Sequence, residues 1–240
     1  MRKIRTVLSC LLLLCYAALP ASALAQERKV QHKPFIDERR LHYGFYIGLH
    51  DQGLHLQGNG YQDPSTGAQW LSENDQMNFG FTVGVLAELR MSRYLALRVL
   101  PGLHFGSKHL VFRNQADGAR TTQDMKSTYI SLPVHLKLAA PRFNNYRPYV
   151  LGGLAYNYDL TSGKHTLLRT KASQLMLEAG LGCDLYLPFF KLIPELKFSF
   201  GLGNVLQKNR PDLTDPSQLI YTQSVEKATA NMVTLTFYFE

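Results

Sequence analysis

The chain has 240 residues, of which 45% are hydrophobic and 18% charged, and its formal net charge is +8 at pH 7. This length suits one domain, and a modest excess of bases without interleaved aromatic patches argues against a nucleic-acid-binding protein. No stretch after residue 25 has 18 consecutive apolar residues, which excludes a transmembrane helix in that part of the sequence.

The first 25 residues have the pattern of a secretory signal peptide. Arg2, Lys3 and Arg5 precede an apolar run over 7–19, and a small-x-small cleavage motif follows at 23–25. The apolar run is too short for a membrane-spanning helix, which needs about 20 residues. The sequence therefore predicts a signal peptide at 1–25 and an exported mature chain.

Cleavage would leave one cysteine, Cys183, and a net charge of +5, because the three bases of the signal are removed with no acid (+8 − 3). An intramolecular disulfide would then be impossible, so packing or a closed hydrogen-bonded sheet must stabilise the exported domain. Residues 26–40 are too charged for a barrel strand, and they are predicted to form a periplasmic N-terminal lead.

From residue 41 onward, apolar residues alternate with polar or small ones, as they do in strands whose side chains point to opposite faces. Over 77–90, one face is apolar along its whole length and the other carries charge. A soluble sandwich would bury such an apolar face, whereas a membrane barrel turns it outward to lipid.

The alternation predicts eight strands. They cover about 41–56, 77–91, 95–112, 128–139, 148–159, 173–187, 192–203 and the end of the chain at 233–239. The second, fourth and sixth are followed by short turns, and the four other connections are long and polar, at about 57–76, 113–127, 159–172 and 204–229.

An even number of strands with short turns at one end and long loops at the other is typical of outer-membrane barrels. We therefore expect an all-β fold over 41–240: an eight-stranded antiparallel transmembrane β-barrel with short periplasmic turns, long extracellular loops and both termini in the periplasm. A soluble up-and-down barrel is the alternative. Interfacial aromatic girdles are expected at Phe79, Phe81, Phe105, Phe143, Tyr146, Tyr149, Tyr156, Tyr158, Phe189 and Phe190.

The lumen of an eight-stranded barrel is narrow enough to be filled by side chains. The predicted inward-facing charged and histidine residues are Glu88, Arg90, Arg98, His104, Lys108, His135, Lys137, Glu178, Asp184, Glu195 and Lys197. Because buried charges are costly unless they are paired, we expect an internal network of ion pairs and hydrogen bonds. Its expected role is to plug and stiffen the lumen, with a conducting or gating role as the alternative.

Catalytic chemistry has weak support in the sequence. A lipid-modifying barrel enzyme could use serine and histidine at the outer rim, and the candidates are His50, Asp51, His55, His109, Ser162 and His165. The chain contains no G-x-S-x-G motif, no H-E-x-x-H motif and no cysteine pair in its mature part. We expect no enzyme activity, no cofactor, no metal and no small-molecule substrate.

Three stretches resemble the Bacteroidetes-type outer-membrane β-barrel family. They are Tyr129–Lys137 (YISLPVHLK), Arg147–Tyr156 (RPYVLGGLAY) and Leu235–Glu240 (LTFYFE). The resemblance covers about 41–240 and implies an outer-membrane barrel in contact with membrane lipid. These motifs build barrels and imply little about function.

A narrower resemblance is to the PorT family, through Asp37–Phe45, Gly48–His50 and Ile193–Gly201 followed by Gly203-Asn204. This resemblance implies an accessory or assembly component of the type IX protein secretion system, which exports proteases and adhesins and serves gliding in motile species. Other type IX secretion proteins would be its partners, and it would not be the translocation pore. A lipid-modifying enzyme and an orphan structural or adhesin barrel are the alternatives.

Overall fold

A computed structural model describes residues 30–58, 70–74, 79–114, 120–162, 170–207 and 225–240. The chain divides into two compact units, residues 1–31 and 32–240, and the second unit forms the barrel. The predicted signal peptide over 1–25 lies outside the described residues.

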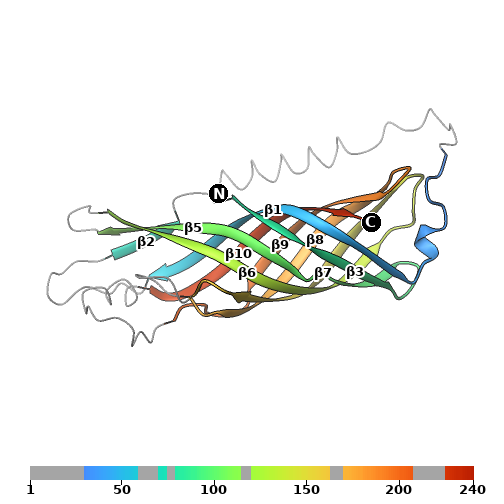
Figure 1. Ribbon diagram of the computed structural model, residues 1–240. Coiled ribbons are helices and arrows are strands. Elements are labelled where there is room, and N and C mark those ends of the chain that lie inside the picture. The colour runs from blue at the N-terminus through green and yellow to red at the C-terminus, as the bar shows by residue number, and fades with distance from the viewer. Residues whose placement is uncertain (1–29, 59–69, 75–78, 115–119, 163–169, 208–224) are drawn as a thin grey trace, which may run out of the picture. The chain divides into compact units, whose positions relative to one another are not determined.

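Ten strands and one 3₁₀ turn make up the described secondary structure (Figure 1). They are η1 (Ile36–Glu38), β1 (Leu41–Gly58), β2 (Trp70–Asn74), β3 (Phe79–Arg90), β4 (Leu95–Val99), β5 (Gly102–Asn114), β6 (Arg120–Ala139), β7 (Tyr146–Asp159), β8 (Ser173–Tyr186), β9 (Lys191–Gly201) and β10 (Val225–Phe239).

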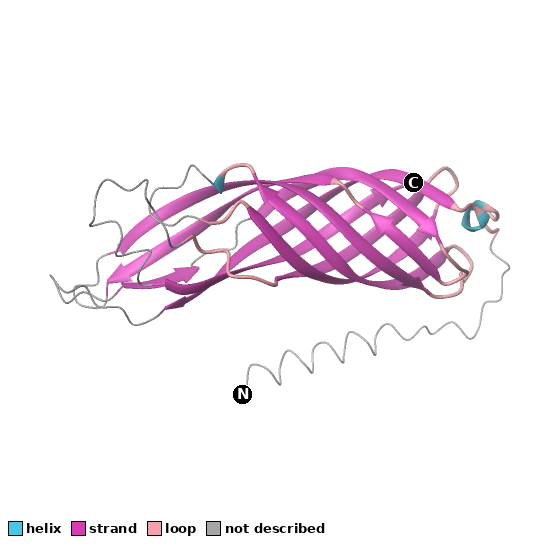
Figure 2. Ribbon diagram, turned by 90° about the horizontal axis from the view of Figure 1, so that it is seen from below, coloured by secondary structure: helices cyan, strands magenta, loops and turns pink. Residues whose placement is uncertain are grey.

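The strands close into a ring in which every pairing is antiparallel. β1 pairs with β10 on one side and with β3 on the other, which joins the first and last strands of the barrel. β4 and β5 both pair with β3 and β6, so these two segments are successive halves of one wall strand. The nine strands of the ring therefore occupy eight positions, which confirms the predicted eight-stranded barrel. Figure 2 shows the strands inclined to the barrel axis.

The interruption of the third predicted strand has a local cause. Pro101 has no N–H to donate to the ladder, so the regular pairing breaks between β4 and β5. Its carbonyl still accepts a hydrogen bond from the Val85 backbone (3.0 Å), and the Leu100 N–H donates to the Pro133 carbonyl (3.1 Å). These two bonds keep the wall continuous across the break.

The strands extend further at the loop end than the alternation predicts. The predicted loop over 113–127 is largely strand, because β5 and β6 continue as a paired hairpin through Arg113 and Arg120. β2 and the start of β10 likewise lie within predicted loops, and β2 pairs with β5 beyond the part of β5 that pairs with β3. Outside the lipid these extensions need no apolar face, so hydrophobic periodicity does not reveal them.

An apolar band covers the outer wall. On β1, the outward side chains of Leu41, Tyr43, Phe45, Ile47 and Leu49 are 48–73% exposed. Eight strand rises cover about 26 Å, which a tilt of about 40° reduces to roughly 20 Å along the membrane normal. A continuous apolar band of that height facing outward identifies a transmembrane barrel. Among the described residues, no helix is long and apolar enough to span a bilayer.

Aromatic side chains border this band at both ends. Phe143, Tyr146 and Phe189 are exposed at the end with the short turns, and Phe79 and Tyr158 are exposed towards the other end. This distribution is typical of interfacial girdles.

The expectation for Tyr149 is wrong. Its side chain is only 4% exposed and points into the lumen. The facing of its strand is ambiguous in the sequence, because Gly152 and Gly153 interrupt the alternation of apolar and polar residues.

Candidate functional site: the charged lumen and its capped mouth

A buried arginine bridges the barrel from wall to wall. Arg98 on β4 donates from Nε and Nη2 to Glu88 Oε2 (2.9 and 2.7 Å) and from Nη1 to Glu195 Oε2 on β9 (2.7 Å). β4 and β9 are four positions apart in either direction around the ring, so they are opposite walls. The hydroxyls of Tyr149 and Tyr238 also donate to the Glu195 carboxylate, each at 2.7 Å.

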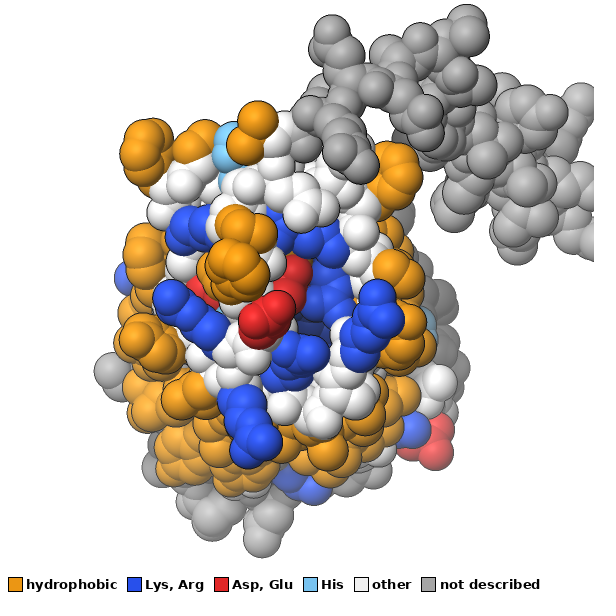
Figure 3. Space-filling model, turned by 90° about the vertical axis from the view of Figure 1, so that its right-hand side faces the viewer, with side chains coloured by type: hydrophobic (Ala, Val, Ile, Leu, Met, Phe, Trp, Pro, Cys, Tyr) orange, Lys and Arg blue, Asp and Glu red, His pale blue; other side chains and the backbone are white. Residues whose placement is uncertain are grey.

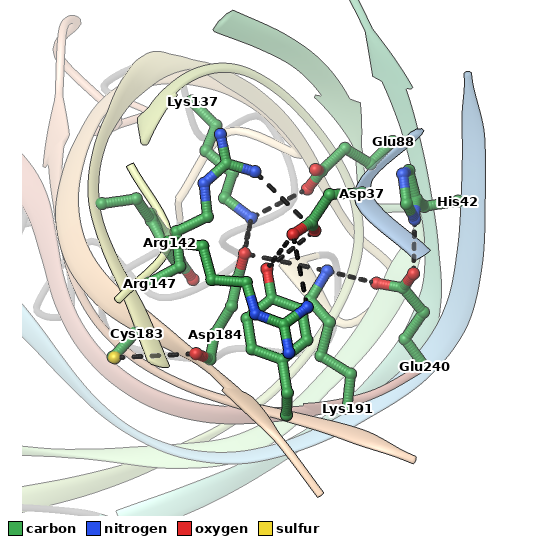
Figure 4. A network of polar contacts seen from close by, with 12 residues as sticks. Asp37, His42, Glu88, Lys137, Arg142, Arg147, Cys183, Asp184, Lys191 and Glu240 are labelled. Carbon is green, nitrogen blue, oxygen red and sulfur yellow. Dashed lines mark hydrogen bonds and ion pairs between the residues drawn. The ribbon is translucent and has the colours of Figure 1, made fainter. Parts of the chain in front are cut away.

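Two lysines extend this network towards the end of the barrel that carries the short turns (Figure 4). Lys137 Nζ donates to both carboxylate oxygens of Asp184 (2.9 Å each) and to Glu88 Oε2 (3.3 Å). Lys191 Nζ donates to Glu240 Oε2 (2.7 Å) and lies 3.7 Å from Asp184 Oδ2. Each of these buried cations is therefore within reach of two carboxylates.

Glu240, directly after the last strand, joins the network to the first strand. Its Oε1 lies 2.5 Å from His42 Nδ1, and His42 Nε2 lies 3.1 Å from the Arg39 carbonyl oxygen. Burial acts to raise the pKa of Glu240, but the hydrogen bond with His42 and the charge of Lys191 outweigh it and lower that pKa to about 2. The carboxylate is therefore ionised at neutral pH.

A second cluster centres on Glu178, further along the lumen. Its Oε2 lies 2.6 Å from His135 Nε2 and 3.2 Å from Lys197 Nζ, and its Oε1 accepts a hydrogen bond from Ser199 Oγ (2.7 Å). All four side chains are buried. One carboxylate is thus held by a cation, an imidazole and a hydroxyl.

Beyond this cluster the interior becomes less charged. The rings of His50 and His104 are tilted against each other with centroids 5.1 Å apart, and Gln52 Nε2 lies 2.8 Å from His50 Nε2. A cavity of about 10 Å³, room for about one water molecule, is lined here by His104, Gln52, Asn157 and other side chains. An apolar cluster then fills the loop end of the interior; its buried members are Leu54, Ala155, Met176, Val205, Leu206, Val225, Ala228, Ala230 and Met232.

At the opposite end, residues 32–40 form a cap that packs across the mouth. Ile36 is 8% exposed, and the Asp37 carboxylate accepts hydrogen bonds from the Tyr186 hydroxyl at 2.7 and 2.9 Å. Arg142 and Arg147 approach the same carboxylate at 3.7 and 3.8 Å. The Arg142 guanidinium also lies over the Tyr186 ring, 3.6 Å from its centroid.

Backbone contacts fix the rest of the cap. Arg142 donates to the carbonyls of His32 and Lys33, and the His32 N–H donates to Asn145 Oδ1 (2.9 Å). Arg90, which is among the predicted lumen residues, lies at this mouth and donates to the backbone carbonyl of Asp37. Arg90 thus belongs to the cap contacts, and within the described residues no ion pair links it to the buried network.

The other predicted lumen residues fall into distinct groups. Glu88, Arg98, Lys137, Asp184 and Glu195 meet in the first network. His135, Glu178 and Lys197 form the second cluster, and His104 is buried beside His50. The side chain of Lys108 lies outside the described residues.

Several network members are absent from the predicted set: Asp37, His42, Lys191 and Glu240. Lys191 is the first residue of β9 and Glu240 directly follows β10, so each lies one residue outside the strand expected from the sequence. Alternation alone could have identified them, because Lys191 has the same parity as Glu195, and Glu240 the same parity as Tyr238.

The rim candidates for catalysis do not share one face. On β1, His50 points inward, Asp51 is half-buried and His55 is exposed. Ser162 is buried, and its Oγ lies 3.4 Å from the Asp159 carbonyl oxygen. The side chains of His109 and His165 lie outside the described residues, and in the described part of the chain no three His, Cys, Asp or Glu residues are grouped to hold a metal ion.

Comparisons with known proteins concern the barrel as a whole. A family described as "Outer membrane protein beta-barrel domain" matches residues 24–207. No curated protein gives a significant match.

Two solved structures are similar to this chain at low identity. Ail, the attachment invasion locus protein of Yersinia pestis, solved in complex with the heparin analogue sucrose octasulfate, is 13% identical; the match covers 82% of this chain and 96% of Ail, with a TM-score of 0.37. The outer membrane protein OprG from Pseudomonas aeruginosa is 12% identical, with coverages of 83% and 92% and a TM-score of 0.43.

Proposed function

The chain belongs to the outer membrane protein β-barrel domain family, and on that premise we propose that it is a non-conducting accessory component of the type IX protein secretion system. It is an integral outer-membrane β-barrel protein. In the proposed orientation, the capped mouth and both termini face the periplasm and the long loops face outward. The protein acts through contacts with other proteins at its cap, its loops or its lipid-facing wall.

The bridge from Arg98 to Glu195 is the observation that carries the non-conducting role. It joins opposite walls at 2.7 Å, and Tyr149 and Tyr238 flank it on the same carboxylate. An eight-stranded barrel is already too narrow for a wide aqueous channel. The Arg98–Glu195 bridge with its two tyrosines and the apolar cluster at the loop end both lie across the interior, so the barrel offers no path for a folded cargo protein.

The resemblance to the PorT family supports the secretion assignment. The segments that resemble this family are Asp37–Phe45, Gly48–His50 and Ile193–Gly201. They form part of the cap, the start of β1 and the inner face of β9 apart from Lys191. β9 contributes Glu195, Lys197 and Ser199 to the lumen. The segments that resemble the family therefore contribute to the capped mouth and to one wall of the charged interior.

A clean deletion of the gene in the source bacterium tests the proposal. We expect cargo proteins with the type IX C-terminal signal to disappear from the medium and the cell surface, as measured by quantitative proteomics, and to return when the wild-type gene is restored. The abundance of unrelated outer-membrane proteins is the control for a general envelope defect. Undiminished cargo outside the deletion strain would refute the secretion role.

A further inference from the structure

Six arginines gather at the capped mouth. Arg39, Arg40 and Arg93 are exposed, and Arg90, Arg142 and Arg147 are half-buried. We call these six residues the basic ring. Figure 3 looks onto this end and shows Lys and Arg side chains around a hollow that has Asp and Glu near its centre. The apolar side chains form a band outside this basic ring, so the positive charge is directed along the barrel axis more than towards the bilayer.

The half-buried arginines use most of their donors on neutral groups. Arg142 Nε donates to the Asn144 carbonyl, and Arg147 Nε donates to the Ala140 carbonyl, both at 2.8 Å. Carbonyl oxygens satisfy the N–H groups but do not cancel the charge. The Asp37 carboxylate is shared between two guanidinium groups at 3.7 and 3.8 Å. Glu38 is the other acid of the cap, so the six arginines still leave positive charge in excess at the mouth.

The acids inside the barrel compensate little of this excess. The first network has four carboxylates, Glu88, Asp184, Glu195 and Glu240, against the three buried cations Arg98, Lys137 and Lys191, a difference of one charge (4 − 3). Among the described residues, the three exposed arginines form no ion pair with a carboxylate. The basic ring therefore presents positive charge that no carboxylate of the described residues neutralises.

An exposed aromatic accompanies the charge. Phe35 lies in the cap and is 71% exposed, although the next residue, Ile36, is buried. A protein segment can contact both a phenyl ring and a guanidinium, and aromatic and arginine side chains are enriched at protein interfaces. A lipid headgroup would use the charge but offer no apolar group to Phe35.

We propose that the capped mouth is a docking surface for an acidic segment of a soluble periplasmic protein, with the basic ring attracting it and Phe35 anchoring it. This inference rests on the proposed function for its orientation and for the existence of a protein partner. Electrostatic complementarity of this kind sets the rate and specificity of association.

Charge reversal provides the test. The variant Arg39→Glu/Arg40→Glu/Arg93→Glu changes the exposed arginines, whose side chains donate no hydrogen bond that holds the cap among the described contacts. The matched control is Lys126→Glu/Lys171→Glu/Lys227→Glu, which makes the same change in charge at exposed positions of the loop end. Folding of both variants is checked by heat-modifiable mobility in SDS gels.

The probe is the photo-crosslinking residue p-benzoylphenylalanine, introduced at Phe35 of the full-length protein in the source bacterium. We expect adducts to a protein peptide rich in Asp and Glu, identified by mass spectrometry, with a yield at least about fivefold lower in the arginine variant and unchanged in the lysine control. An adduct to phospholipid or to a glycan, a peptide without acidic residues, or a yield insensitive to charge reversal would overturn the proposal.

The secretion assay separates this inference from the proposed function. If deletion abolishes cargo export while the arginine variant exports and crosslinks like wild type, the docking surface is wrong and the secretion role stands. If deletion leaves export intact while the charge-dependent acidic adduct persists, the docking surface stands and the secretion role fails.

Discussion

Arg98 and Glu195, 97 residues apart in the sequence, meet at 2.7 Å across the lumen from opposite walls of the barrel. The guanidinium also binds Glu88, so a single cation holds two carboxylates in a fully buried site. Removing one partner of such an assembly leaves an uncompensated buried charge, which costs more than the net contribution of the intact assembly.

Replacement of the bridging arginine is expected to destabilise the barrel strongly. Arg98→Met leaves the carboxylates of Glu88 and Glu195 buried without their shared cation, and we expect a loss of about 3–5 kcal/mol in the free energy of unfolding. Urea titration in lipid vesicles, followed by circular dichroism, measures it. The exposed Lys126→Met is the control and should change stability by less than about 0.5 kcal/mol. If Arg98→Met lost no more stability than the Lys126→Met control, the assigned role of the bridge would be contradicted.

The second cluster predicts energetic coupling between Glu178 and Lys197, which lie 3.2 Å apart. Either Glu178→Gln or Lys197→Met alone leaves its partner buried without a counter-charge, whereas the double variant removes both charges. In a double-mutant cycle we expect the double variant to be more stable than the sum of the two single losses implies, with a coupling of about 1–3 kcal/mol. Additive losses would show that the two charges do not interact.

The side-chain carboxylate of Glu240 predicts a defined pH dependence of stability. Folding lowers the pKa of Glu240 from its ordinary value of 4.5 to about 2. A depressed pKa contributes stability that is complete above pH 4.5 and is lost as pH falls towards 2. Glu240→Gln should therefore be less stable than wild type by about 3 kcal/mol at pH 7. The difference should shrink between pH 4.5 and 2, and unfolding titrations at several pH values would measure it. A difference independent of pH would refute the proposed origin of the shift.

The apolar outer band predicts a cost that depends on depth. Five outward-facing apolar side chains of β6 are exposed, at Ile130, Leu132, Val134, Leu136 and Leu138; Val134 is the middle one and Leu138 is the last before the short turn. We expect Val134→Arg to destabilise the lipid-inserted barrel by about 2–4 kcal/mol and Leu138→Arg by about 0–1 kcal/mol. Equilibrium unfolding from vesicles gives both values. Equal effects at the two depths would argue against lipid around this wall.

The alternation of residue types was sufficient to predict the barrel, because lipid and lumen impose opposite chemistry on successive side chains. The same rule placed Glu88, Arg98 and Glu195 on the inner face. It could not pair them, since Arg98 meets Glu195 only through the register of strands far apart in the sequence. Contacts of this kind depend on ring closure, which one sequence does not specify.

The errors occur where that rule weakens. Tyr149 faces the lumen although its position suggests a girdle, because the glycines of β7 obscure the facing of its strand. The hairpin of β5 and β6 extends beyond the lipid, where no apolar face marks it. The cap contacts of Asp37 depend on a segment that looks like a charged tail in the sequence, and only the folded mouth supplies its partners.

Ionic conductance across a planar bilayer is the most direct measurement of the sealed lumen. The full-length wild-type protein, with correct folding verified by heat-modifiable mobility, is inserted from detergent and recorded in concentrated potassium chloride. Because Arg98, Glu195 and the apolar cluster close the interior, we expect no stepwise conductance from the inserted barrel. Reproducible open-channel steps from wild-type protein would contradict the account.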